Sequence, residues 1–124
     1  MKHDLFSDAM SAINNAENVG KESCAVPKSN FIEKVLDVIK SCGYISGFSV
    51  ADESIEVRLL GKINKIKSIK PRFSVKKGEF DRWEIHYLPA RNMGILILST
   101  SQGIMSQADA EKKGVGGKLV AYVY

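Results

Sequence analysis

The sequence lacks the patterns on which most enzymes and membrane proteins depend. It has only two cysteines and two histidines in 124 residues, and no apolar run approaches the ~18 residues of a membrane-spanning helix. No segment matches a nucleophile elbow, a Walker phosphate loop or a dinucleotide-binding glycine pattern. Metal-ligand residue types do not cluster along the chain. We therefore expect no enzymatic activity, cofactor, metal, small-molecule substrate or membrane association.

The two cysteines give no sign of a disulfide framework or a zinc site. Cys24 and Cys42 do not have C-x-x-C spacing, and we interpret them as buried or partly buried free thiols in a reducing compartment. The first ten residues are acidic and amphipathic, unlike a secretory signal peptide. We therefore expect a cytoplasmic location.

Positive charge is concentrated in one half of the chain. Residues 1–60 contain six Lys/Arg and nine Asp/Glu, whereas residues 61–124 contain twelve Lys/Arg and five Asp/Glu. Such asymmetry favours a polyanionic partner for one face, because phosphate contacts supply most of the non-specific affinity of nucleic-acid-binding proteins. A solubilising basic surface is the alternative.

Residues 1–60 are predicted to form an N-terminal subdomain with the order α-β-α-β-β. Strands are expected at Ser23–Val26, Tyr44–Val50 and Ile55–Leu60, with both helices on one face of a small antiparallel sheet. A helix over residues 3–18 would bury Leu5, Phe6, Ala9, Met10, Ile13 and Ala16. A second helix, capped by Ser29 or Asn30 and ended by Gly43, would bury Phe31, Ile32, Val35, Leu36, Ile39 and Cys42.

The connector GKINKIKSIKPRFSVKK, residues 61–77, has seven Lys/Arg and no acidic residue. Pro71 prevents a helix through its middle and disfavours a central strand. We expect an extended, edge-like segment with apolar anchors and an outward basic fringe that contacts phosphates, through Lys62, Lys65 and Arg72 among others. Lysines on an exposed strand edge also prevent aggregation, which is the alternative role.

Residues 61–124 complete an α+β protein as a mostly β C-terminal subdomain with one short helix. Ile95–Leu98 is predicted to be a buried strand and Lys118–Tyr124 the final strand. Between them lie the polar loop Ser99–Gly103 and a helix that Ser106 begins and Gly114 ends. The loop offers three hydroxyls and an amide but no acid, base or thiol, so it suits binding rather than catalysis. Before them, Phe80 and Trp83 are interpreted as a small apolar patch, followed by a turn over residues 87–91.

Several of these segments together resemble a known family. They are AINNAENVGK (12–21), VPKSN (26–30), GYISGF (43–48), the basic connector (61–77), YLPARNMGILILSTSQGIMS (87–106) and GVGGKLVAYVY (114–124). The chain is similar to the eighth small-subunit ribosomal protein, the S-eight family, in its archaeal and eukaryotic branch.

This resemblance implies a cytoplasmic protein of the ribosome that binds small-subunit rRNA and has ribosomal proteins as neighbours. The family binds an irregular helix in the central domain of that rRNA and supports its folding and assembly. The loop Ser99, Thr100, Ser101, Gln102 and Gly103 would contact an unstacked base and backbone, because such bases can be read by hydroxyls. The RNA backbone would be braced by Ser11, Asn14, Lys28 and Ser29. Gly117 and Lys118 are also expected to bind RNA, and Lys118 can offer its charge to a phosphate.

Two other functions stay open at this level. One is a protein-interaction module whose exposed C-terminal strand pairs with a partner. The other is an mRNA-binding translational regulator, because a free ribosomal protein can bind an mRNA that mimics its rRNA site.

Overall fold

The chain folds as an α+β protein of two compact units. The computed structural model describes residues 5–69, 73–90 and 93–124, and the contacts divide the chain into residues 1–67 and 68–124. The sequence pattern predicts a boundary after Leu60, whereas in the structure it lies after Lys67. The reason is that the first part of the basic connector is held by the first helix, through hydrogen bonds that the backbone N–H groups of Ile63 and Ile66 donate to Glu17 and Asn14.

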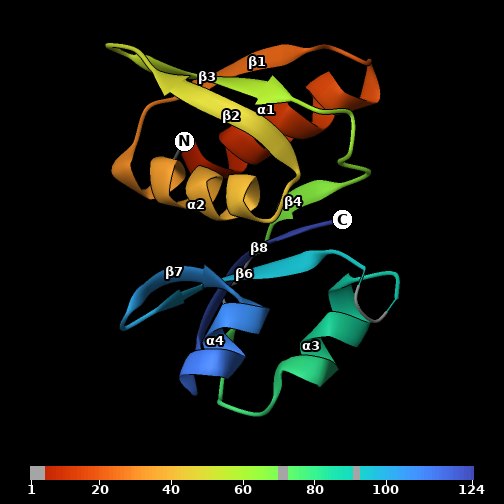
Figure 1. Cartoon of the computed structure of the whole chain (residues 1–124), viewed down its shortest axis with the longest axis vertical. Coiled ribbons are helices and arrows are strands. Elements are labelled where there is room, and N and C mark those ends of the chain that lie inside the picture. Colours follow the sequence, from red (N-terminus) through yellow and green to blue (C-terminus); the bar gives the residue numbers. More distant parts are fainter. Residues whose placement is uncertain (1–4, 70–72, 91–92) are drawn as a thin grey trace, which may run out of the picture. The chain divides into compact units, whose positions relative to one another are not determined.

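The first unit has the predicted order of helices and strands. Its elements are α1 (Leu5–Asn18), β1 (Ser23–Pro27), α2 (Asn30–Ser41), β2 (Ile45–Val50) and β3 (Ser54–Leu59). The three strands form an antiparallel sheet with the order β1-β3-β2. Both helices lie on the same face of this sheet, where α1 packs on β1 and α2 on β2 (Figure 1).

Two residues that were expected to be buried in this unit are exposed, both at helix ends. Leu5 is 50% exposed because it is the first residue of α1, whereas the next residue, Phe6, is already buried. Cys42 is exposed because α2 ends at Ser41. Ser29 is the N-cap residue of α2, as expected, although its side chain makes no capping hydrogen bond. The helix termini therefore extend beyond the core that fixes the central turns.

The second unit is organised around the last strand. Its elements are β5 (Ser74–Val75), α3 (Phe80–Tyr87), β6 (Ile95–Thr100), β7 (Gly103–Ser106), α4 (Gln107–Lys113) and β8 (Gly117–Val123), and β4 (Ile66–Ser68) spans the boundary. The sheet order is β4-β8-β6-β7, and β5 also pairs with β8. Because β8 has strands on both sides and is buried over most of its length, the expectation of an exposed C-terminal strand for partner pairing is wrong.

Local signals correctly predict α4 but neither β7 nor α3. The Ser106 hydroxyl accepts a hydrogen bond from the backbone N–H of Asp109 at 3.4 Å, and Gly114 ends the helix with a φ of 67°. By contrast, β7 was expected to be loop and helix cap, and α3 was expected to be an irregular apolar patch. Only Phe80 of α3 is fully buried, so its sequence carries little of the apolar periodicity that identifies a helix.

The basic connector has the expected character where the structure describes it. Ile63, Ile66, Ile69 and Val75 are buried anchors, while the lysines at 62, 65, 67, 76 and 77 are exposed. Lys70, Pro71 and Arg72 lie outside the described residues, so the phosphate contact predicted for Arg72 stays a prediction. No helix among the described residues is long and apolar enough to span a membrane.

Candidate functional site

The predicted polar loop is a tight hairpin turn between β6 and β7. Thr100 pairs with Gly103 across the hairpin, which leaves Ser101 and Gln102 as the turn. The Thr100 hydroxyl donates to the carbonyl oxygen of Gly103 at 2.7 Å and accepts from the backbone N–H of Gln102 at 3.1 Å. Gly103 has a φ of 115°, a conformation that other residues rarely adopt. Thr100 and Gly103 thus hold the turn, and the exposed Ser101 and Gln102 form its tip.

A row of polar side chains runs across the sheet next to this tip. Lys118 of β8 pairs with Ser99 of β6 on one side and with Ser74 of β5 on the other. Directly opposed residues share one face of a sheet, and neighbouring Leu98 and Leu119 belong to the buried cluster of this unit. Because side chains alternate along a strand, Ser99 and Lys118 face away from that cluster.

The double glycine brings β8 close to its neighbours. A Cβ on Gly117 would lie 2.5 Å from the carbonyl oxygen of Ser99 and 2.8 Å from Thr100 Cγ2, and a Cβ on Gly116 would overlap the carbonyl oxygen of Val75. Gly117 therefore acts through packing: its missing side chain sets where Ser99 and Thr100 lie. The structure brings together all the residues predicted at this end, Ser99–Gly103, Gly117 and Lys118.

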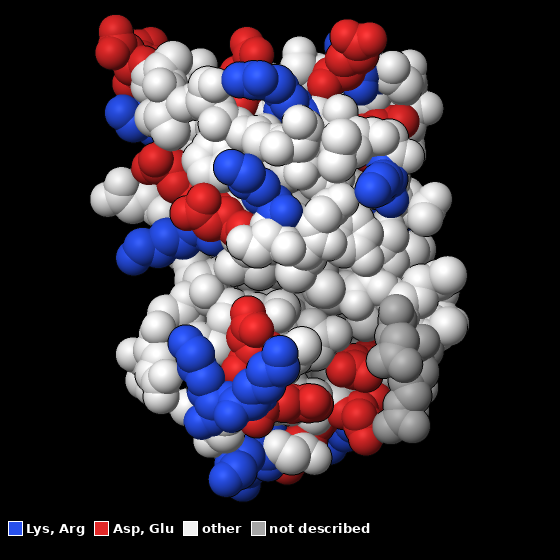
Figure 2. All heavy atoms as spheres, viewed as in Figure 1, with Lys and Arg blue, Asp and Glu red and all other residues white. Residues whose placement is uncertain are grey.

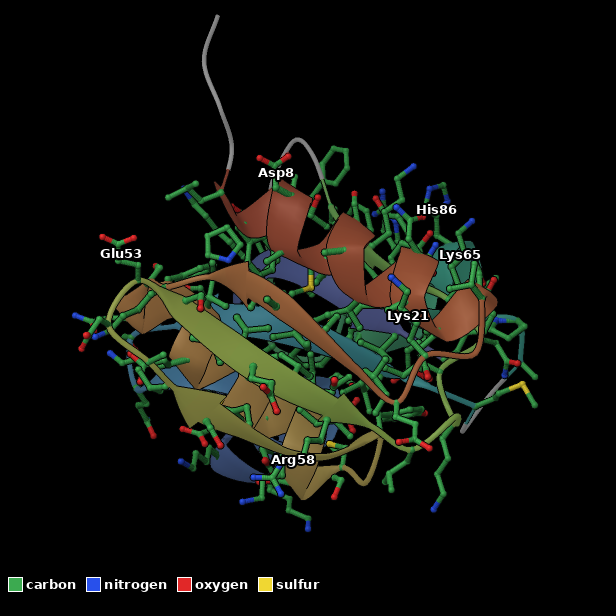
Figure 3. All side chains as sticks on the ribbon, turned by 90° about the horizontal axis from the view of Figure 1, so that it is seen from above. Asp8, Lys21, Glu53, Arg58, Lys65 and His86 are labelled. Carbon is green, nitrogen blue, oxygen red and sulfur yellow. The ribbon has the colours of Figure 1, made fainter. Side chains whose placement is uncertain are left out.

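A second group of predicted residues meets in the first unit. Ser11 and Asn14 of α1 and Lys65 of the connector line a hollow of about 340 Å³, together with Asn15, Ile66 and Lys67. Figure 3 shows Lys65 beside the C-terminal half of α1, where Lys21 also lies. The hollow exists because Asn14 Oδ1 accepts from the backbone N–H of Ile66 at 3.2 Å, and Glu17 Oε2 accepts from that of Ile63 at 2.8 Å.

The remaining predicted residues do not join this group. Lys28 and Ser29 precede α2, and neither they nor the exposed Lys62 line the hollow. Asn15 and Lys67 line it although they were not predicted as site residues. The sequence does carry a signal for them, because Asn15 lies on the same polar face of α1 as Ser11 and Lys67 belongs to the basic run.

The two cysteines differ in environment. Neither forms a disulfide bond; Cys24 is half-buried in β1 and Cys42 is exposed after α2. Burial, and then the negative charge of Glu17, raise the pKa of the Cys24 thiol, while Lys21 opposes this shift. Cys24 is therefore protonated over a wider pH range than an exposed thiol, which suits a packing role.

Comparison with known proteins places the chain in a family. The model of the family described as Ribosomal protein S8 matches residues 4–124. The chain belongs to the ribosomal protein S8 family. It is 48% identical to the small ribosomal subunit protein uS8 of Haloarcula marismortui, with 98% of each chain covered. It is 47% identical to the uS8 protein of Methanococcoides burtonii, over 98% of this chain and 97% of the relative.

These findings confirm the resemblance to archaeal members of the S-eight family. A third relative, uS8 of Halorubrum lacusprofundi, is 45% identical over 98% of both chains. The chain is thus a structural, non-enzymatic ribosomal protein of the archaeal type, and its place is in the ribosome in the cytoplasm.

Proposed function

We propose that this protein is a primary rRNA-binding protein of the small ribosomal subunit, which recognises an irregular helix in the central domain of the rRNA and supports its folding. The observation that carries the proposal is the hairpin tip beside the Ser99–Lys118 pair. It combines exposed groups that donate and accept hydrogen bonds with one positive charge. Family membership supports the same proposal.

The tip suits the reading of unpaired bases. The Thr100 hydroxyl is engaged in the turn, so Ser101 and Gln102 are the residues that reach outward to base edges or 2′-OH groups. Hydroxyl and amide side chains both donate and accept, which matches the mixed pattern of a base edge. Lys118 only donates, and it suits a phosphate next to the base. A regular A-form major groove is too narrow to be read in this way, so the proposed target is an internal loop.

The hollow on the first unit supplies a different kind of contact. Ser11 and Asn15 present neutral polar groups, and the exposed Lys65 and Lys67 present positive charge on the same surface. Such a combination suits a sugar-phosphate backbone, because it neutralises phosphates and hydrogen-bonds to sugars without reading bases. In this proposal the first unit positions the RNA and the hairpin tip of the second unit specifies it.

A gel-shift titration at two salt concentrations tests the proposal. One RNA carries the central-domain helix with its internal loop, and the other has the loop replaced by Watson–Crick pairs. We expect a preference of roughly 10³ for the irregular RNA, by analogy with specific DNA binders. We also expect log affinity to fall with log salt by about 0.7–0.9 per neutralised phosphate. Equal affinities for the two RNAs would mean that the protein binds RNA only through a general basic surface, which would contradict the proposal.

A further inference from the structure

Positive charge alone does not locate the RNA on the second unit. Residues 68–124 contain nine Lys/Arg and five Asp/Glu, and Figure 2 shows both signs of charge over the part of the surface formed by α3 and α4. Strand pairing is more informative, because it fixes which side chains stand next to one another. It places a third polar residue, Ser74 of β5, beside the Ser99–Lys118 pair.

Ser74 faces the same side of the sheet as Ser99 and Lys118. Each of the three residues has a neighbour along its strand that belongs to the buried cluster of this unit; these neighbours are Val75, Leu98 and Leu119. Because side chains alternate along a strand, Ser74, Ser99 and Lys118 all point away from that cluster. Across β5, β8 and β6 they form a row in which two hydroxyls flank one ammonium group.

The backbone holds Ser74 close to Lys118. The backbone N–H of Leu119 donates to the carbonyl oxygen of Phe73 at 2.9 Å. Ser74 and Lys118 are therefore the closer, non-hydrogen-bonded kind of antiparallel pair, in which the Cα atoms lie roughly 4.5 Å apart. Val75, the next residue of β5, is 3% exposed, so a buried side chain anchors this two-residue strand.

The Ser74 hydroxyl is available to a ligand. Ser74 is exposed, and its side chain makes no hydrogen bond to another residue in the described parts of the chain. The Thr100 hydroxyl, by contrast, is used within the hairpin turn. A hydroxyl can donate to a phosphate oxygen and can either donate to or accept from a ribose 2′-OH. Beside an ammonium group, such a hydroxyl suits a sugar-phosphate backbone.

We propose that Ser74 is a further RNA-binding residue, which hydrogen-bonds to the sugar-phosphate backbone next to the phosphate that Lys118 neutralises. The proposal rests on the rRNA recognition proposed above and extends its site from the hairpin tip across β8 to β5. The tip contacts a base at one end of the row and Ser74 contacts the backbone at the other. The row thus fixes the direction in which the RNA strand crosses the sheet. The residue pattern does not single out Ser74, because the lysines and arginines of the connector carry the signal for phosphate contact.

Ser74→Ala tests the proposal, with Ser46→Ala on an exposed strand of the first unit as the matched control. We expect Ser74→Ala to bind the internal-loop RNA roughly 2- to 12-fold more weakly at each salt concentration, because one hydrogen bond is lost. The slope of log affinity against log salt should stay the same, since a hydroxyl carries no charge. Ser74→Thr, which keeps the hydroxyl, and Ser46→Ala should bind as tightly as the original protein. All three variants should keep its unfolding midpoint in urea.

The outcomes separate this proposal from rRNA recognition as a whole. If the original protein prefers the internal-loop RNA but Ser74→Ala binds it equally tightly, the proposal is overturned and rRNA recognition stands. A slope lower by about 1 in Ser74→Ala would mean that the substitution displaces Lys118, which would also overturn the direct contact. A loss in Ser74→Thr as large as in Ser74→Ala would do the same. Equal affinities of the original protein for the two RNAs would contradict rRNA recognition and, with it, this proposal.

Discussion

Gly117 allows the packing of β8 against β6 to be tested directly. Its φ is not in the positive range, so the backbone conformation itself would accept alanine. The obstacle is steric, since the new Cβ would lie 2.5 Å from the Ser99 carbonyl oxygen and 2.8 Å from Thr100 Cγ2. Because the nearer atom belongs to the backbone, the two strands must separate. We expect Gly117→Ala to lower the free energy of unfolding by about 1–3 kcal/mol, the usual cost of overpacking.

Urea unfolding followed by tryptophan fluorescence measures this cost. Trp83 is the only tryptophan, and it lies in the same unit as Gly117, stacked on Phe73 at 5.0 Å. With a urea dependence of about 1–3 kcal/mol per molar, the unfolding midpoint should fall by on the order of 1 M. Gly47→Ala is the matched control, because a Cβ on this strand glycine would meet no atom within 4 Å. A midpoint for Gly117→Ala equal to that of Gly47→Ala would refute the steric argument.

Three further predictions concern single side chains. Asn14→Ala leaves the backbone N–H of Ile66 without its acceptor and should destabilise the protein by about 1–3 kcal/mol. Asn15→Ala should instead weaken RNA binding without changing the unfolding midpoint. Equal unfolding midpoints for the two variants would contradict the structural role of Asn14. Lys118→Gln should lower the slope of log affinity against log salt by about 1, and an unchanged slope in gel-shift titrations would show that Lys118 contacts no phosphate. Because the pKa of Cys24 is raised, iodoacetamide at pH 8 should modify it more slowly than the exposed Cys42, as mass spectrometry of the two peptides would show.

Features set by a few neighbouring residues were predictable from the sequence. The start and end of α4 follow from Ser106 and Gly114, whose side-chain acceptor and left-handed backbone act within one turn. The buried stripes of α1 and α2 follow from helical periodicity, except at their ends. The residue pattern predicted the polar loop Ser99–Gly103, but it could not reveal that this loop is the turn of a hairpin, in which Thr100 is engaged while Ser101 and Gln102 are exposed.

Features set by contacts between distant segments were not predictable. The helix α3 has no side-chain cap at Glu79 and one buried residue, Phe80. It is held instead by ring stacking, with Trp83 between Phe73 and Tyr87, and with Tyr87 on Tyr122 of β8. The hollow on α1 likewise depends on hydrogen bonds to residues 46 and 52 positions away along the chain. Helical or strand periodicity carries no information on such pairs.

The most direct test of the reading role of the hairpin is Ser101→Ala, with Ser46→Ala on an exposed strand of the first unit as the control. Both variants remove one exposed hydroxyl, so both should keep the unfolding midpoint of the original protein. Loss of a base contact costs about 0.5–1.5 kcal/mol. The account therefore predicts that Ser101→Ala binds the internal-loop RNA roughly 2- to 12-fold more weakly, with unchanged affinity for the fully paired RNA. Equal losses on both RNAs, or no loss on either, would contradict it.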